Sequence, residues 1–151
     1  MSAATGGKVG FIQRLLHGAG SGKRPQTTFG ARVLVIDDSA TVCAAVSRML
    51  VSEDYRVLTA ADGQAGIALA ISEQPALLFL DVVMPELDGG EVFTQFRTDP
   101  VLKHTPIIFL TSIVRQKEVD EHKGMIGGSF FLAKPVNADG LIGAIEEHLH
   151  S

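Results

Sequence analysis

Four short apolar runs in this chain each end at a residue that can bind a metal ion or a phosphoryl group. These residues are Asp37 with Asp38, Asp81, Thr111 and Lys134, which follow the runs 33–36, 77–80, 107–110 and 130–133. Fully apolar runs of this length are typical of buried parallel strands. Because ligands bind beyond the carboxyl ends of the strands in an open parallel sheet, the sequence predicts that these side chains share one crevice.

The three carboxylates predict a magnesium site. Carboxylates in one pocket repel each other unless a cation lies among them, and oxygen ligands suit Mg²⁺. An aspartate beside such an ion can attack an activated phosphorus atom and form an acyl phosphate. The hydroxyl of Thr111 and the ammonium of Lys134 would stabilise the charge that develops on the phosphoryl oxygens. A lone aspartate at a strand end is commonly a helix cap or turn former, but four strand ends that agree favour phosphoryl chemistry.

The elements that must position these residues alternate from Arg32 onward. The predicted strands are about 32–36, 56–60, 77–81, a fourth that begins after Pro106 and a fifth that ends at Ala133. The predicted helices are one capped by Ser39 that ends near Ser52, then about 63–72, 91–97, 115–122 and 139–150. Pro85 and Asp88-Gly89-Gly90 predict a loop and turn. This (βα)5 pattern predicts a doubly wound α/β sandwich with a parallel five-stranded sheet.

Composition favours a globular protein of the cytoplasm. The chain has 151 residues, of which 46% are hydrophobic and 20% are charged, as in ordinary soluble domains. It contains neither an apolar stretch of about 18 residues nor the apolar core of a secretory signal, so we expect no transmembrane segment. The single cysteine, Cys43, forms no internal disulfide, which agrees with a reducing compartment.

Charge divides the chain into two predicted regions. Residues 1–30 carry four basic residues and no acidic one, whereas residues 31–151 have a net charge of −8. A domain that acidic is a poor nucleic-acid binder. Residues 1–30 are predicted to be a flexible basic extension, either disordered or with a short amphipathic segment for docking or for a membrane surface that includes Val9, Ile12 and Leu16. Since the last amphipathic segment ends at the C-terminus, we expect no separate output domain.

The spacing of these motifs resembles the receiver domain of bacterial two-component response regulators, a CheY-like, flavodoxin-like fold. The resemblance covers about residues 31–150. The motifs that carry it are Asp37-Asp38, Asp81-x-x-Met84-Pro85-x-x-Asp88-Gly89, Thr111-Ser112 and Lys134-Pro135. Together they are highly specific to that family, and the Lys134-Pro135 bond matches one that is usually cis in it.

The resemblance implies a role for each residue of the crevice. Asp81 would accept a phosphoryl group from a histidine kinase. Asp38 and Asp81 would bind Mg²⁺, with Asp37 acting largely through water and the carbonyl of Val83 as a further ligand. Thr111 and Lys134 would contact the phosphoryl oxygens. The protein would therefore be no enzyme beyond catalysing its own phosphorylation and dephosphorylation.

Three further positions matter to signalling in that family. Phe131 matches the aromatic switch position, although a plain core aromatic is the alternative. Val83 and Ile113 flank the route of the attacking water, and both are apolar here. Because an apolar side chain cannot orient water, we expect slow loss of the phosphoryl group.

The expected function is that of a stand-alone response regulator whose phosphorylated surface binds a downstream protein such as a motor or a polar scaffold. The stretch 123–135 resembles regulators of the chemotaxis-like pathway for type IV pili and twitching motility. Flagellar chemotaxis and phosphorelay shuttling are alternatives, as is an interaction module that is never phosphorylated. A hydrolase of the haloacid dehalogenase type is disfavoured because the first strand lacks the Asp-x-Asp pattern of that family.

Overall fold

The strands form one sheet in the order β2-β1-β3-β4-β6-β5. The computed structural model describes residues 30–84, 89–112, 125–126 and 129–150. Its strands are β1 (Arg32–Ile36), β2 (Arg56–Ala60), β3 (Leu77–Asp81), β4 (Ile107–Thr111), β5 (Met125–Ile126) and β6 (Ser129–Ala133). Its helices are α3 (Ala40–Val51), α4 (Gly63–Glu73), α5 (Gly89–Thr98) and α7 (Ala138–His150). The pairings from β2 through to β6 are all parallel, so the predicted five-stranded parallel sheet is confirmed.

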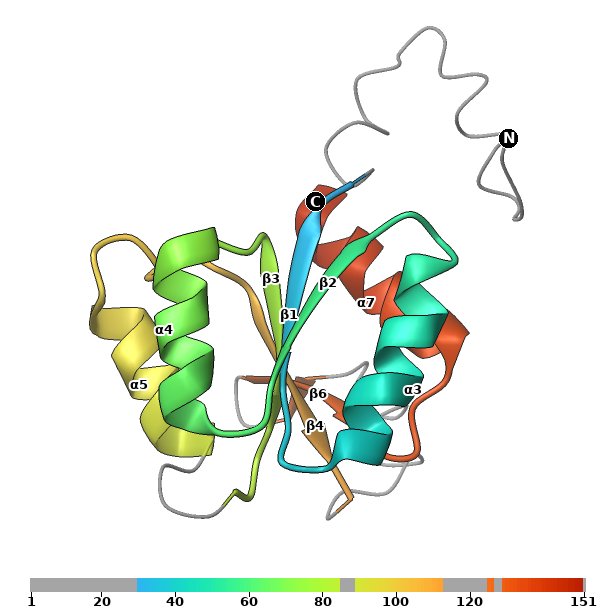
Figure 1. Cartoon of the computed structure of the whole chain (residues 1–151), viewed down its shortest axis with the longest axis horizontal. Helices are drawn as coiled ribbons and strands as arrows, with labels where there is room; N and C mark the ends of the chain where they lie inside the picture. The colour runs from blue at the N-terminus through green and yellow to red at the C-terminus, as the bar shows by residue number, and fades with distance from the viewer. Residues whose placement is uncertain (1–29, 85–88, 113–124, 127–128, 151) are drawn as a thin grey trace, which may run out of the picture.

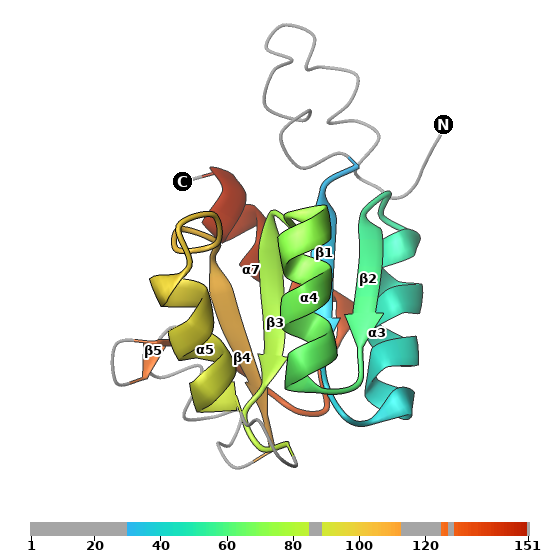
Figure 2. The ribbon, with the colours of Figure 1, turned by 60° about the vertical axis from the view of Figure 1, so that its left-hand side comes forward.

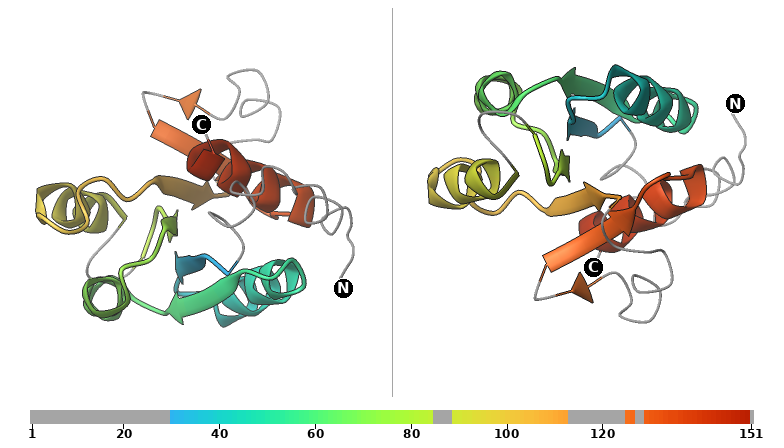
Figure 3. Two further views of the ribbon diagram at one scale, coloured as in Figure 1. Left: turned by 90° about the horizontal axis from the view of Figure 1, so that it is seen from above. Right: turned by 90° about the horizontal axis from the view of Figure 1, so that it is seen from below.

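Helices cover both faces of the sheet. Figure 1 shows α4 and α5 on one side and α3 and α7 on the other, and the same layers are visible along the strands in Figure 3. In β1, Val33 and Val35 pack into the core below α3 and α7, while Leu34 and Ile36 pack into the core below α4 and α5. This alternation of side chains explains why the strands are apolar throughout: each must fill two cores.

Capping residues fix where the helices begin. The Ser39 hydroxyl accepts a hydrogen bond from the Val42 N–H at 3.2 Å, as the sequence predicts for a helix cap. The Asp62 carboxylate accepts one from the Ala65 N–H at 2.8 Å at the start of α4. Both helices therefore begin directly beyond the carboxyl ends of β1 and β2, on the side of the sheet where the candidate site lies.

Two features differ from the sequence prediction. Gly89 and Gly90 form the first turn of α5 rather than a turn before it, so this helix begins two residues earlier than predicted. The two-residue strand β5, which pairs antiparallel with β6, was not predicted because two residues show no periodicity. The predicted helix at 115–122 and residues 1–29 of the basic extension lie outside the described residues. Within the described residues, none of the helices has the length and apolar character needed to cross a bilayer.

Candidate functional site

The strand ends bring the candidate residues to one place. In Figure 2 the arrowheads of β1, β2 and β3 point to the same end of the sheet. Asp37 follows β1, Asp81 closes β3, Thr111 closes β4 and Lys134 follows β6. Asp37, Asp81 and Thr111 are buried, while Asp38 is exposed. The structure therefore brings these side chains to one crevice, and three of its polar groups are withdrawn from water.

Lys134 ties two of the carboxylates together. Its Nζ lies 2.9 Å from Oδ2 of Asp37 and 3.2 Å from Oδ1 of Asp81, to which it also donates a hydrogen bond. The backbone N–H of Lys134 donates to the carbonyl of Thr111 at 2.8 Å, which continues the pairing of β4 with β6. A single cation thus bridges the ends of β1 and β3 from a strand on the far side of β4.

The three aspartates have the geometry of a cation site. One carboxylate oxygen from each of Asp37, Asp38 and Asp81 lies within 4.8 Å of the others. Oδ1 of Asp37 accepts a hydrogen bond from the Ser39 N–H at 2.9 Å. Oδ2 is buried and, among the described residues, accepts no hydrogen bond of good geometry, although it contacts Lys134. An oxygen donor set with one underused buried oxygen fits Mg²⁺, which prefers a few carboxylates and retained water.

Electrostatics at the site also favour an additional cation. Burial raises the pKa of Asp81, and the nearby charge of Asp37 raises it further, against the opposing effect of Lys134. Burial alone would lower the pKa of Lys134, but its close contact with the Asp37 carboxylate and its hydrogen bond and charge interaction with Asp81 outweigh burial and raise it. Lys134 is therefore held as a cation, yet it does not compensate fully for the grouped carboxylates.

Thr111 and Phe131 lie on the strands next to Asp81. Thr111 is 3% exposed and aligns with Ala133 in the parallel pairing of β4 with β6. Phe131 is half-buried and its ring stacks on that of Phe109, with the ring centroids 5.2 Å apart. Phe131, the candidate switch residue, therefore lies on β6 beside Phe109, which is two residues before Thr111 at the end of β4.

Val83 and the loop after β3 complete the surroundings of Asp81. The side chain of Val83 is 64% exposed, which leaves it on the surface beyond the strand end. Ile113, the second residue predicted to shield the site, lies outside the described residues, as do Pro85 and Asp88 of the motif.

Gly89 has a packing role at the site that the sequence did not predict. Its N–H donates to the Val82 carbonyl at 3.1 Å, and a Cβ at this position would lie only 2.5 Å from the Asp81 carbonyl oxygen. The start of α5 is therefore packed directly against the backbone that carries Asp81. The Asp88-Gly89 pair signals a turn, but the pair alone does not show that a side chain is excluded at Gly89.

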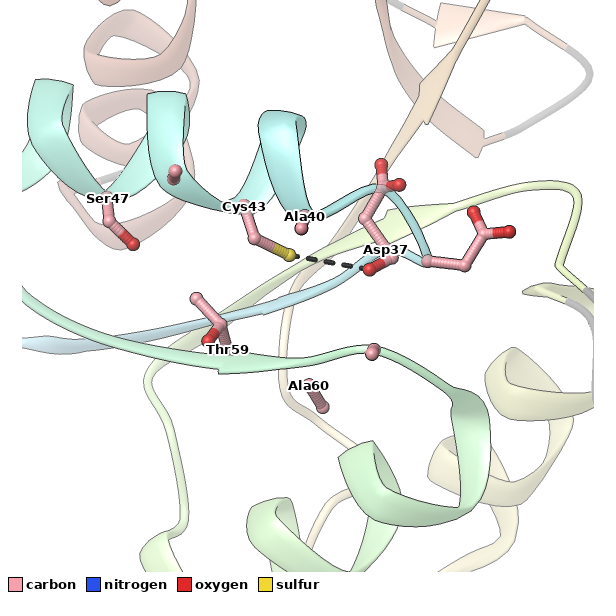
Figure 4. Close-up of a pocket in the computed structure, with 9 residues that line it drawn as sticks. Asp37, Ala40, Cys43, Ser47, Thr59 and Ala60 are labelled. Atoms are coloured by element: carbon pink, nitrogen blue, oxygen red, sulfur yellow. Dashed lines mark hydrogen bonds between the residues drawn. The ribbon is translucent and has the colours of Figure 1, made fainter.

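A groove of about 520 Å³ opens beside the aspartates, between α3 and β2. Figure 4 shows Cys43 on its wall, with the thiol donating to the backbone carbonyl of Asp37 at 3.4 Å. Burial, followed by the charge of Asp37, raises the pKa of the Cys43 thiol. The raised pKa leaves the Cys43 thiol with little thiolate character.

This fold and this arrangement of acids, hydroxyl and lysine define a response regulator receiver domain. The family model described as "Response regulator receiver domain" matches residues 33–146. The chain belongs to this family. The matched residues include every candidate residue of the site, from Asp37 to Lys134.

Two relatives match this chain over most of their own length. Protein PilG of Pseudomonas aeruginosa is 35% identical over 127 residues, which cover 83% of this chain and 93% of PilG. Protein PilH of the same organism is 34% identical over 116 residues, which cover 76% of this chain and 94% of PilH.

Solved structures share the fold. The chemotaxis protein CheY4 of Vibrio cholerae superposes with a TM-score of 0.68 at 34% identity, covering 79% of this chain and 98% of CheY4. The receiver domain of the Pseudomonas aeruginosa sensor histidine kinase PA1611 superposes with a TM-score of 0.69 at 25% identity, covering 81% and 99% of the two chains. That structure holds a magnesium ion coordinated in its active-site cleft.

Proposed function

We propose that this chain is a phosphorylation-dependent response regulator in which Asp81 accepts a phosphoryl group from a histidine kinase. Asp37, Asp38 and Asp81, with the carbonyl of Val83, would hold Mg²⁺. Thr111 and Lys134 would contact the phosphoryl oxygens, and the phosphorylated surface would bind a downstream protein. Family membership and the acidic cluster support this assignment.

The observation that carries the proposal is the position of Lys134. Its Nζ lies between Asp37 and Asp81, within 3.2 Å of an oxygen of each. A lysine used only as a counter-ion would balance two carboxylates, yet here three carboxylates face one lysine. A flexible ammonium group beside an acidic cluster is suited to follow a phosphoryl group that arrives on Asp81.

The proposed transfer needs little from the chain beyond position and charge. An oxygen of the Asp81 carboxylate attacks the phosphorus of a phosphohistidine, and the new P–O bond replaces the P–N bond. The electron pair of the broken bond stays on the imidazole nitrogen of the donor. Lys134 and the Thr111 hydroxyl stabilise the equatorial oxygens, and a bound Mg²⁺ would neutralise charge on both the carboxylates and the phosphoryl group.

A direct test is phosphorylation by a small donor. Incubation with Mg²⁺ and acetyl phosphate should add one phosphoryl group, which intact-mass and peptide mass spectrometry would place on Asp81. Asp81→Asn should abolish the adduct. Asp54→Asn is the matched control, because Asp54 is exposed and precedes β2 at the other end of the sheet. An adduct that persists in Asp81→Asn, or none in the parent chain, would contradict the proposal.

We also propose that the acyl phosphate is long-lived, because Val83 and Ile113 cannot orient an attacking water. Val83→Asn should then shorten its half-life several-fold, measured by loss of the adduct after the donor is removed. Val101→Asn is a suitable control, since Val101 is 57% exposed, close to the 64% of Val83, and precedes β4 at the opposite end of the sheet. Equal half-lives in the parent and Val83→Asn would show that the apolar residue does not limit hydrolysis.

For the pathway, we propose type IV pilus or twitching signalling, on the similarity to Protein PilG and Protein PilH and on the stretch 123–135. Chemotaxis is the second candidate, because the CheY4 structure is that of a chemotaxis protein. A deletion strain complemented with parent or Asp81→Asn protein distinguishes the two. Loss of twitching with normal swimming supports the first, and the reverse supports the second.

A further inference from the structure

Three phenylalanine rings form a continuous stack beside the site. Phe93 of α5 and Phe109 of β4 have ring centroids 5.6 Å apart with planes inclined by 28°. Phe109 and Phe131 of β6 are 5.2 Å apart with planes inclined by 26°. The stack therefore joins a helix and two strands that are separated widely in the sequence, and Phe109 is its central ring.

Arg97 fixes the far end of this stack. Its guanidinium carbon lies 5.0 Å from the centroid of Phe93, close enough for a cation–π contact. One guanidinium nitrogen, Nη1, donates to the carbonyls of Lys103 and Thr105 at 3.2 and 2.9 Å. Phe93 is thus held between Phe109 and an arginine that is itself bound to the connection between α5 and β4.

The other end of the stack meets the proposed switch. Phe109 lies two residues before Thr111 on β4, so both side chains project from the same face of the strand. Phe109 aligns with Phe131 in the strand pairing, just as Thr111 aligns with Ala133. A displacement of Phe131 that follows Thr111 would have to part the ring of Phe131 from that of Phe109.

The next residue of β6 is held in a different way. Phe130 points to the opposite face and meets the imidazole of His148 edge-on, with the ring centroids 4.2 Å apart and the planes inclined by 89°. Phe131 is thus the aromatic residue of β6 whose position is set by the stack, and it remains half-buried rather than enclosed.

We propose that Phe109 and Phe93, held by Arg97, are positioning residues that latch Phe131 in its stacked position in the unphosphorylated protein. This inference rests on the proposed function and on the switch role predicted for Phe131, in which phosphorylation of Asp81 moves its ring. Breaking one ring pair costs enough to change the ratio of the stacked and displaced positions about fivefold. The latch therefore sets how readily the chain adopts its signalling state before any phosphoryl group arrives.

The test places a 4-fluorophenylalanine at position 131 and follows its ¹⁹F resonance with Mg²⁺ alone and with Mg²⁺ and beryllofluoride. Phe109→Leu should shift the Mg²⁺-only population about fivefold toward the beryllofluoride position. Phe93→Leu should act in the same direction and serves if Phe109→Leu fails to fold. Phe93→Tyr keeps the ring and should behave as the parent chain.

Phe79→Leu is the control for a purely structural effect. Phe79 is fully buried in β3 on the other face of the sheet, so its loss should lower stability without changing the resonance at position 131. A second readout is the initial rate of Asp81 phosphorylation by acetyl phosphate, which should rise about fivefold in Phe109→Leu and not in Phe79→Leu. An equal response of the two variants, or none in Phe109→Leu, overturns the latch.

Failure of the latch and failure of the proposed function give different results. If Asp81 acquires its phosphoryl group while the resonance at position 131 does not respond to any stack variant, the latch is wrong and the proposed function stands. If Asp81 acquires no phosphoryl group in the parent chain, the proposed function is wrong and the latch falls with it.

Discussion

The two ends of the sheet place their charged groups in opposite environments. At the carboxyl end, Asp37 and Asp81 are buried and face Lys134 across 2.9 and 3.2 Å. At the amino end, Arg56 is exposed, and Arg32 donates from Nε to the carbonyl of Glu73 at 2.8 Å in an exposed position. Backbone hydrogen bonds close the amino end, such as the one from the Ala76 N–H to the Arg32 carbonyl at 2.8 Å.

This difference indicates that the functional groups at the carboxyl end of the sheet lower the stability of the fold. Buried carboxylates that outnumber their cation repel each other, so the carboxyl end carries an electrostatic cost that a bound metal or phosphoryl group would change. The amino end has satisfied backbone groups and solvated charges, which contribute little either way. Substitutions at the carboxyl end should therefore have large effects that depend on Mg²⁺, and those at the amino end small effects that do not.

The largest effect is expected for Lys134→Met. Loss of the ammonium leaves Asp37 and Asp81 facing each other, so the free energy of unfolding of the Mg²⁺-free protein should fall by about 3 kcal/mol. Urea denaturation in EDTA measures this, and excess Mg²⁺ should restore part of the loss. Lys103→Met, at an exposed lysine before β4, should change stability by less than about 0.5 kcal/mol. Similar losses in the two variants would remove the contrast between the ends.

Gly89→Ala should be the next largest. The added Cβ would lie 2.5 Å from the Asp81 carbonyl oxygen and 2.9 Å from that of Val82, so backbone must move. We expect a loss of about 2 kcal/mol, together with slower phosphorylation of Asp81. Gly143→Ala is the matched control, because its Cβ meets nothing within 4 Å in an exposed part of α7. That substitution should stabilise the protein by about 0.5–1 kcal/mol. Thermal unfolding should therefore give a lower melting temperature for Gly89→Ala and a higher one for Gly143→Ala. Equal changes in the two variants would contradict the close packing at Gly89.

Asp38→Asn should stabilise the Mg²⁺-free protein. Asp38 is exposed, so relief of its repulsion with Asp37 and Asp81 is screened by solvent and should contribute less than about 1 kcal/mol. The increase in melting temperature on adding Mg²⁺ should shrink at the same time, because one of three carboxylates is lost. Asp54→Asn should change neither quantity. A destabilised Asp38→Asn protein in EDTA would mean that the carboxylates do not repel.

The smallest effect is expected for Arg32→Ala. It removes an exposed hydrogen bond to the Glu73 carbonyl, so the loss should be about 0.5 kcal/mol or less. The response to Mg²⁺ and the phosphorylation of Asp81 should equal those of the parent chain. A change in either would show that the two ends of the sheet are coupled.

The sequence predicts that the site residues come together, because the carboxyl ends of parallel strands lie at the same end of a sheet. The bounds of β1, β2 and β3 agree with the prediction, since each strand is a short run rich in apolar residues of the length typical of strands. The predicted cap at Ser39 is also confirmed, because capping depends on local hydrogen bonding. These features depend on short stretches of chain and on one rule of topology.

Contacts between elements could not be predicted in the same way. Alternation places Phe109 on a face of β4, but it does not say that Phe93 from α5 and Phe131 from β6 stack on it. Nor does a glycine in a turn motif reveal that Gly89 touches the Asp81 backbone. Such contacts depend on the distance between elements, which a single sequence does not specify.

The short strand β5 has a consequence for self-association. A parallel sheet exposes a strand edge on each side, and unpaired backbone groups there can recruit a strand from another molecule. Here β5 pairs with Ser129 and Phe130, so it covers the first two residues of β6 and leaves the rest of that edge open among the described residues. On the other side β2 is the edge, with the exposed Arg56 at its start. A charged side chain on an edge strand discourages edge-to-edge pairing, so Arg56 makes β2 a poor surface for a second copy of the chain.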